Sequence, residues 1–130
     1  MILTIRTDKQ DAEIGLFSDE GKKISYKTWQ AHRELSSTIL GVIKELLDSQ
    51  KLDFKDITGV VFYKGPGSFT GLRIGITVAN TIAYAQHLPI IGETDEIWNQ
   101  IGVRRLIAGE NDQIVLPLYG AEPRITTARK

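Results

Sequence analysis

The spacing of apolar and polar residues changes along the chain from strand-like patterns to a helical repeat. Short apolar runs and two-residue alternation, separated by polar turns, are typical of strands. The strands predicted in this way are 2–7, 12–17, 23–29, 58–64, 89–92 and 113–118. Apolar residues three and four positions apart are typical of amphipathic helices. The helices predicted in this way are 33–50, 71–88 and 95–107.

The order of these elements indicates an α/β fold of the form β-β-β-α-β-α-β-α, with a mixed sheet and helices packed on it. Short turns favour antiparallel pairing of the first three strands, and helical crossovers favour parallel pairing of the later ones. A chain of 130 residues suits one domain, which we expect to span residues 1–119. Residues 120–130 combine a proline and charges without periodicity, so we expect a loosely held C-terminal tail.

Composition narrows the class of protein without pointing to a ligand. Sixteen basic residues balance sixteen acidic ones, so net charge gives no argument for nucleic-acid binding. The chain has no cysteine, which excludes disulfides and thiolate metal sites. It begins directly with an apolar strand, and no apolar run is long enough to cross a bilayer. We therefore expect a cytoplasmic protein without a membrane partner.

The glycine-rich turn that precedes the second predicted helix is the most informative stretch of the chain. Such a turn can hold an anion, because backbone N–H groups and the helix dipole point the same way. The residues of this weak candidate anion site are Gly65, Pro66, Gly67, Ser68, Phe69 and Thr70. Phosphate-loop and dinucleotide signatures both fail at Thr70, where each needs a glycine. We expect Thr70 to cap the helix and Phe69 to pack on Ile74 as a hydrophobic staple.

The second predicted helix is apolar on two sides. Small residues recur every four positions, at Gly71, Gly75, Ala79 and Ala83, and such a stripe lets another helix come very close. A separate apolar face, which we expect to pack on the sheet, consists of Ile74, Val78 and Ile82. The small stripe could receive a helix of another protein, or the helix 33–50 of the same chain, and the sequence leaves both open.

No set of residues with an evident catalytic arrangement stands out. The two histidines, His32 and His87, have no second histidine at ligand spacing, which favours a cap, surface or interface role over metal binding. Ser68 lies outside any nucleophile-elbow motif.

The remaining aromatic and basic candidates have ordinary structural interpretations. Trp29 and Trp98 are expected to be packing residues rather than base-stacking platforms. The C-terminal region is mildly basic, and it is either a solvated surface or a weak RNA-facing patch; its basic residues are Arg104, Arg105, Arg124, Arg129 and Lys130.

At this point the residues match a known family. The run GPGSFTGLRIG at 65–75 resembles the signature of the TsaB (YeaZ) family, and the match extends to four further segments. Those segments are 32–35, 52–60, 89–92 and 117–119. The resemblance implies a single lobe of the actin-like and Hsp70-like ATPase (ASKHA) fold. It also implies a non-catalytic subunit, without a cofactor, of the machinery that makes tRNA threonylcarbamoyladenosine.

The resemblance further implies partners. A TsaD-like catalytic subunit would pair with the two N-terminal helices, a TsaE-like ATPase would dock on that pair, and tRNA would be met only through the complex. Without TsaD, the same helices would form a homodimer. Together with the small stripe, this gives the expected partner-binding residues His32, Leu35, Ile39, Val42, Leu46, Gly71, Leu72, Gly75, Ala79 and Ala83.

Two departures from the family pattern bear on an alternative function. Arg6 stands where the family usually carries an aspartate that could manage a metal and phosphates. The second lobe of the family is expected to be missing, since the third helix leads almost directly to the closing stretch. The alternative is a nucleotide-binding protein or enzyme of the ASKHA class that uses the 65–70 turn for phosphate. A glycopeptidase-like hydrolase would lack metal ligands and a nucleophile–base pair.

Overall fold

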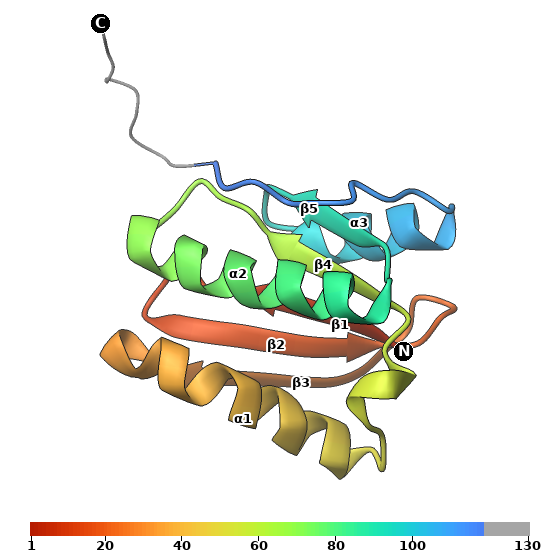
Figure 1. Ribbon diagram of the computed structural model, residues 1–130, viewed down its shortest axis with the longest axis horizontal. Coiled ribbons are helices and arrows are strands. Elements are labelled where there is room, and N and C mark those ends of the chain that lie inside the picture. The colour runs from red at the N-terminus through yellow and green to blue at the C-terminus, as the bar shows by residue number, and fades with distance from the viewer. Residues whose placement is uncertain (119–130) are drawn as a thin grey trace, which may run out of the picture.

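A five-stranded mixed sheet with helices on both faces forms the protein (Figure 1). The computed structural model describes residues 1–118, apart from the side chain of His32. The strands are β1 (Ile2–Arg6), β2 (Asp11–Phe17), β3 (Lys23–Gln30), β4 (Gly59–Tyr63) and β5 (Ile90–Glu93). The α-helices are α1 (Leu35–Ser49), α2 (Phe69–Gln86) and α3 (Trp98–Ile107). Single 3-10 turns lie at His32–Glu34 and Phe54–Asp56. The predicted order β-β-β-α-β-α-β-α is confirmed.

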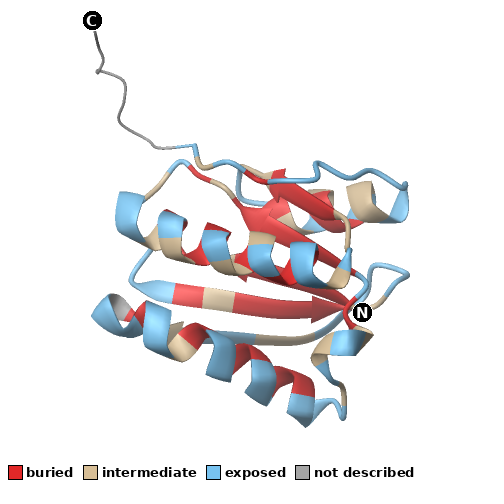
Figure 2. Ribbon diagram, viewed as in Figure 1, coloured by how far each residue is buried: buried red, intermediate tan, exposed pale blue. Residues whose placement is uncertain are grey.

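The strand order is β3-β2-β1-β4-β5. Strands β1, β2 and β3 pair antiparallel, whereas β1 with β4 and β4 with β5 pair parallel, as the connections predicted. Helices α1 and α2 lie side by side on one face, and α3 packs on β4 and β5 from the other face (Figure 1). Because helices cover β4 on both faces, all five of its residues are buried, whereas the edge strand β3 stays largely exposed (Figure 2).

Helix α2 begins two residues earlier than predicted. Ser68 precedes its first turn with an extended ψ of 127°, and no side chain caps the helix. Thr70 lies inside the first turn, so its predicted capping role is wrong. The staple prediction is also wrong, because Phe69 is 54% exposed and its ring lies under the guanidinium of Arg73, 5.3 Å from the ring centroid. The extended backbone at Ser68 ends the turn before Thr70 is reached. 

The predicted strand at 113–118 is absent. This segment pairs with no strand, because it bends at Gln113, whose φ is +70°, and because Asn80 of α2 takes both backbone groups of Val115 that a ladder would use. Pro117 has no N–H to donate to a ladder. Within the segment only Val115 is buried. The tail predicted at 120–130 lies outside the described residues.

Candidate functional site

The glycine turn packs directly onto the link between β1 and β2. A Cβ added at Gly67 would overlap the Cβ of Asp8, and one at Gly65 would overlap the carbonyl oxygen of Leu118. Gly65 also has a φ of +123°, which disfavours any other residue. The backbone N–H of Ser68 donates to the carbonyl of Asp8 at 3.3 Å. The glycines of the turn are therefore required by close packing within this chain.

An internal ion pair lies beside this turn. Arg6 Nε donates to Asp8 Oδ1 at 2.7 Å, and their side chains are only 15% and 7% exposed. Burial by itself lowers the pKa of Arg6, but the hydrogen bond and charge of Asp8 outweigh it and raise that pKa. The guanidinium also lies 3.9 Å from the centroid of the Tyr63 ring, and the Tyr63 hydroxyl donates to the carbonyl of Pro66 at 2.9 Å. Arg6 is thus already paired, and the weak anion site stays a prediction.

The small-residue stripe of α2 faces the interior of this chain. A Cβ added at Gly71 would overlap the carbonyl oxygen of Thr7, and one at Gly75 would overlap its Oγ1. Thr7 Oγ1 donates to the carbonyl of Gly71 at 2.8 Å. Ala79 and Ala83 are 0% and 3% exposed. The expectation that this stripe receives a foreign helix is therefore wrong, because Thr7, which follows β1, comes too close to Gly71 and Gly75 to leave room.

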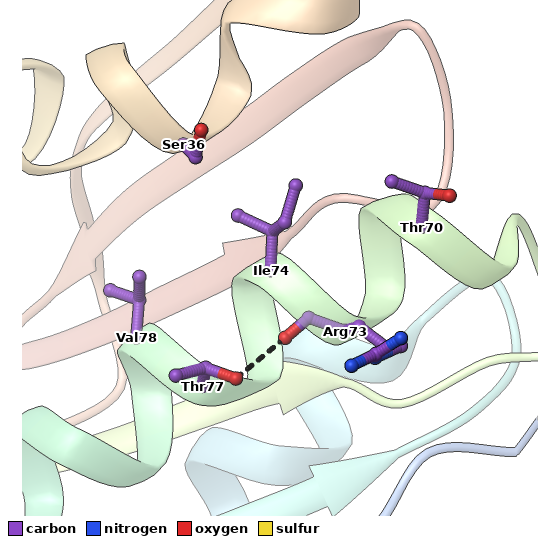
Figure 3. A pocket seen from close by; sticks show the side chains of 6 residues that line it. All are labelled: Ser36, Thr70, Arg73, Ile74, Thr77 and Val78. Carbon is purple, nitrogen blue, oxygen red and sulfur yellow. Dashed lines mark hydrogen bonds between the residues drawn. The ribbon is translucent and has the colours of Figure 1, made fainter.

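The prediction that the second apolar face of α2 packs on the sheet is wrong for two of its three residues. Ile74 and Val78, expected on the sheet, are only half-buried and point toward α1, whereas Ile82 is buried as predicted (Figure 3). The remaining α-helical residues expected at the interface form part of the core, because the apolar stripe of α1 meets the sheet. These residues are Leu35, Ile39, Val42, Leu46 and Leu72. The side chain of His32 lies outside the described residues.

A groove separates the outer sides of α1 and α2. It has a volume of about 430 Å³, and Ile74 and Val78 project across it toward Ser36 of α1 (Figure 3). The full lining is Ser36, Thr70, Arg73, Ile74, Thr77 and Val78. A neighbouring cavity of about 370 Å³ shares Thr70 and Ile74 with it and reaches the β1–β2 link. The groove is lined by aliphatic and hydroxyl side chains and Arg73, whereas the neighbouring cavity also has the charged residues Asp8, Lys9 and Arg33 in its lining.

The α2 side of the surface around this groove carries few charges. Arg73 is the only charged residue among the 18 residues of α2. On α1, Leu40 is 53% exposed, and an added Cβ at Gly41 would meet nothing within 4 Å. Exposed helices normally carry charged residues on their outer face, and depletion of charge marks the centres of protein interfaces. The low charge of α2 was visible in the sequence, but the sequence did not show which side faced outward.

The other candidate residues have structural roles. Trp98 is 2% exposed, with its ring centroid 6.0 Å from that of Tyr63. Trp29 Nε1 donates to Thr38 Oγ1 at 3.1 Å. The packing interpretation of both tryptophans is confirmed. His87 takes left-handed backbone angles as the C-cap of α2, which agrees with its predicted place at a helix end.

Arg105 is occupied by neighbouring carboxylates. It donates to Glu93, Glu110 and Asp112 at 2.7 to 2.8 Å. The hydrogen bond to Glu110, with those to the other two carboxylates, raises its pKa. Arg105 is therefore not available to an RNA backbone, although Arg104 is exposed. Within residues 1–118, no three acidic, histidine or cysteine side chains gather as metal ligands would. None of the described helices combines the length and hydropathy needed to cross a membrane.

Comparison with known proteins connects this fold with tRNA modification. The family model described as "TsaD: tRNA N6-adenosine threonylcarbamoyltransferase" matches residues 29–95, just over half of the 130-residue chain. The chain is 28% identical to the tRNA threonylcarbamoyladenosine biosynthesis protein TsaB of Buchnera aphidicola subsp. Schizaphis graminum, over 98% of the chain and 62% of that protein. It is 30% identical to TsaB of Escherichia coli K12, over 82% of the chain and 48% of that protein. The chain thus spans between 48% and 62% of the length of these two relatives.

Comparison with solved structures also finds YeaZ-related proteins. YeaZ from Pseudomonas aeruginosa matches with a TM-score of 0.63 and 27% identity, over 72% of this chain and 43% of that one. A second structure, an uncharacterized protein with similarity to peptidase YEAZ from Pseudomonas aeruginosa, matches with a TM-score of 0.66 and 26% identity, over the same shares of both chains.

Proposed function

Because this chain belongs to the TsaB (YeaZ) family, we propose that it serves in the biosynthesis of tRNA threonylcarbamoyladenosine as a non-catalytic subunit. In this proposal it is one lobe of the ASKHA fold, and it binds and activates a TsaD-like catalytic subunit. The support for a non-catalytic role is the pairing of Arg6 with Asp8, which engages the two charged side chains at the end of β1 with each other.

The partner surface that we propose is the outer side of α1 and α2, here called the α1/α2 face. Its members are Ser36, Leu40, Gly41, Thr70, Arg73, Ile74, Thr77 and Val78. The observation that carries the proposal is a groove lined by two half-buried aliphatic side chains on a helix with a single charge. This replaces the small stripe of α2, which cannot touch a partner because Thr7 and the sheet cover it.

The chemistry of the face defines the partner. Gly41, Ser36 and Thr77 are small, so a pair of helices can approach α1 and α2 closely. Ile74, Val78 and Leu40 would pack on aliphatic side chains of the partner. Arg73 is exposed and would pair with an acidic side chain at the rim of the contact. A stable contact of this kind buries roughly 800 Å² on each partner, which two helices of this length can supply.

We test the proposal by measuring affinity for a purified TsaD-like protein. Ile74→Asp places a charge in the centre of the groove and should weaken binding at least about tenfold, because an unpaired carboxylate would be desolvated in the contact. Ile97→Asp is the matched control, since Ile97 is 50% exposed and precedes α3, away from the groove. Equal affinity of the two variants would refute the assignment of this face.

The same proteins test the nucleotide-binding alternative. Calorimetry with ATP and magnesium should give no binding to the chain alone, because Asp8 fills the space against Gly67 and its carboxylate is already paired with Arg6. Micromolar binding would favour the alternative. In the absence of TsaD we propose that the α1/α2 face pairs two copies of the chain. A TsaE-like ATPase and tRNA would join only through the complex, in the cytoplasm.

A further inference from the structure

After α3 the chain runs back along the edge of the sheet. The segment 109–118, here called the strap, lies beside β5 and reaches the glycine turn that precedes α2 (Figure 1). None of these described residues belongs to a helix or strand, and only Val115 among them is buried. Directed hydrogen bonds, more than packing in the core, therefore hold the strap in place.

The first attachment of the strap is a guanidinium on α3. Arg105 donates to Glu110 at 2.7 Å and to Asp112 at 2.8 Å, and both of these carboxylates belong to the strap. It also donates to Glu93 of β5 at 2.8 Å. The side chains of Asn111 and Asp112 accept from backbone N–H groups of β5 at 3.0 and 2.9 Å. The fork of one arginine, which suits several carboxylate oxygens at once, thus joins the strap to α3 and β5.

The other attachments of the strap lie on α2 and on the turn before it. Asn80 of α2 exchanges two hydrogen bonds of 3.0 Å with the backbone of Val115. The N–H of Leu118 donates to the carbonyl of Lys64 at 2.7 Å. The carbonyl oxygen of Leu118 lies where any residue other than glycine would place its Cβ at Gly65. The strap therefore connects α3 and β5 with the glycine turn.

The glycine turn is held between two segments that are far apart in the sequence. On one side Asp8 closes on Gly67, and the N–H of Ser68 donates to the carbonyl of Asp8 at 3.3 Å. On the other side Leu118 closes on Gly65. The side chain of Asp8 is 7% exposed, whereas Leu118 is 48% exposed. Segments with few buried contacts open at lower cost in free energy, so the strap is the side of the turn that moves more easily.

We propose that the strap sets the shape of the glycine turn and that Arg105 is its clasp, so that opening the clasp loosens the turn and the first turn of α2. Arg105 is then a positioning residue that acts through Asp112 and the strap. Arg73 and Ile74 of the α1/α2 face directly follow the first turn of α2, so a loosened turn weakens binding at that face. This consequence for binding rests on the proposed function, whereas the coupling of strap and turn does not.

The variant Arg105→Gln removes the clasp. By NMR, amide exchange at Val115 of the strap should accelerate about tenfold, because hydrogen bonds to charged groups are lost. Exchange should also accelerate at Leu72, whose N–H donates to the carbonyl of Ser68 at 3.0 Å in the first turn of α2. The amide of Ala31, at the far edge of the sheet, should keep its rate. Unaltered exchange at Leu72 would overturn the coupling of strap and turn, even if exchange at Val115 became faster.

Two further variants separate the clasp from a general loss of charge. Arg104→Gln makes the same change at the neighbouring, exposed position of α3, and should leave exchange at Val115 and Leu72 unchanged. Asp112→Asn should reproduce the effect of Arg105→Gln, and the double variant should add little to either, because the two residues act through one contact. Fully additive effects would contradict the action of Arg105 through Asp112.

Salt tests the clasp without a substitution. The side chains of Arg105 and Asp112 are 26% and 30% exposed, so dissolved ions reach their contact and screen it. Raising sodium chloride from about 0.05 M to about 1 M should accelerate exchange at Leu72 in the unchanged protein but not in Arg105→Gln. An equal response of both proteins would refute an ionic clasp.

Affinity for a purified TsaD-like protein tests the consequence for binding. Arg105→Gln should weaken that affinity about threefold, whereas Arg104→Gln should not. Unchanged affinity of Arg105→Gln, while Ile74→Asp still weakens binding, would overturn the control of the α1/α2 face by the strap. If Ile74→Asp were harmless, the face itself would be refuted, and exchange at Leu72 would still decide whether the strap shapes the turn.

Discussion

A methyl group added at Gly75 should destabilise the folded chain. Gly75→Ala would place a Cβ that overlaps Thr7 Oγ1 and lies 2.8 Å from Phe62 Cε1. Both neighbours are buried, so neither side chain can move into solvent. Overpacking of this kind costs about 1–3 kcal/mol, and disturbing the bond from Thr7 to Gly71 costs about 1 kcal/mol more. Alanine regains about 1 kcal/mol through its helix propensity. The expected net loss is therefore about 1–3 kcal/mol in the free energy of unfolding.

Gly41→Ala provides the matched control. It makes the same chemical change in an exposed helix position where an added Cβ meets nothing within 4 Å. It should therefore stabilise the chain by about 1 kcal/mol through helix propensity alone. Urea denaturation of the three proteins, with the transition followed by circular dichroism, gives both differences. If the stripe faced a foreign helix, Gly75→Ala would stabilise the isolated chain as Gly41→Ala does, and that result would refute the packing described here.

Two further predictions concern charged groups. Asp8→Ala should lower the free energy of unfolding by about 3 kcal/mol, because it leaves the largely buried guanidinium of Arg6 without its hydrogen-bonded carboxylate. Arg6→Met/Asp8→Ala should recover most of that loss in the same urea assay, and no recovery would contradict a dominant role of the unpaired charge. The pKa of Asp19 is lowered by hydrogen bonds from the N-terminal ammonium of Met1 and from Thr58. Its contribution to stability is therefore present above about pH 4, where an unfolded aspartate ionises, and is lost as the pH falls through the lowered pKa. The stability difference between the unchanged protein and Asp19→Asn should be small, since Asp19 is 59% exposed, and should shrink on acidification, while a difference that grows would refute the sign.

The sequence predicted the kinds of elements because their signals are local. The stripe of α1 and the apolar strands are periodic over short distances, so they could be recognised without knowledge of the fold. The start of α2 was missed because the extended backbone at Ser68 is a property of the turn. Ser and Thr are both common at the N-cap, so the presence of Thr70 in the sequence did not by itself separate position 68 from position 70.

The orientation of α2 could not be predicted, since it depends on a long-range contact. Both of its sides are apolar, and only the approach of Thr7 decides that glycine must face inward. The pairing of Arg6 with Asp8 was missed because residues two apart in an ordinary strand point the same way but seldom bond. Here Asp8 lies beyond the end of β1, where the chain turns. The segment 113–118 looked like a strand because side-chain pairing with Asn80 leaves no signal in hydrophobic periodicity.

The close contact between the glycines of α2 and Thr7 has a consequence for how such chains diverge. The glycines on the inner side of the helix have no side chain that could become smaller, and the packing leaves no space for a larger one. A substitution there could therefore hardly be compensated by a second change within the core. The outer flank has no such restriction, and its residues can change together with those of a binding protein. An alignment of related chains should therefore show two patterns of variation on this one helix. Every fourth position should be nearly constant, because internal packing restricts it. The outward positions between them should vary together with residues of the binding protein.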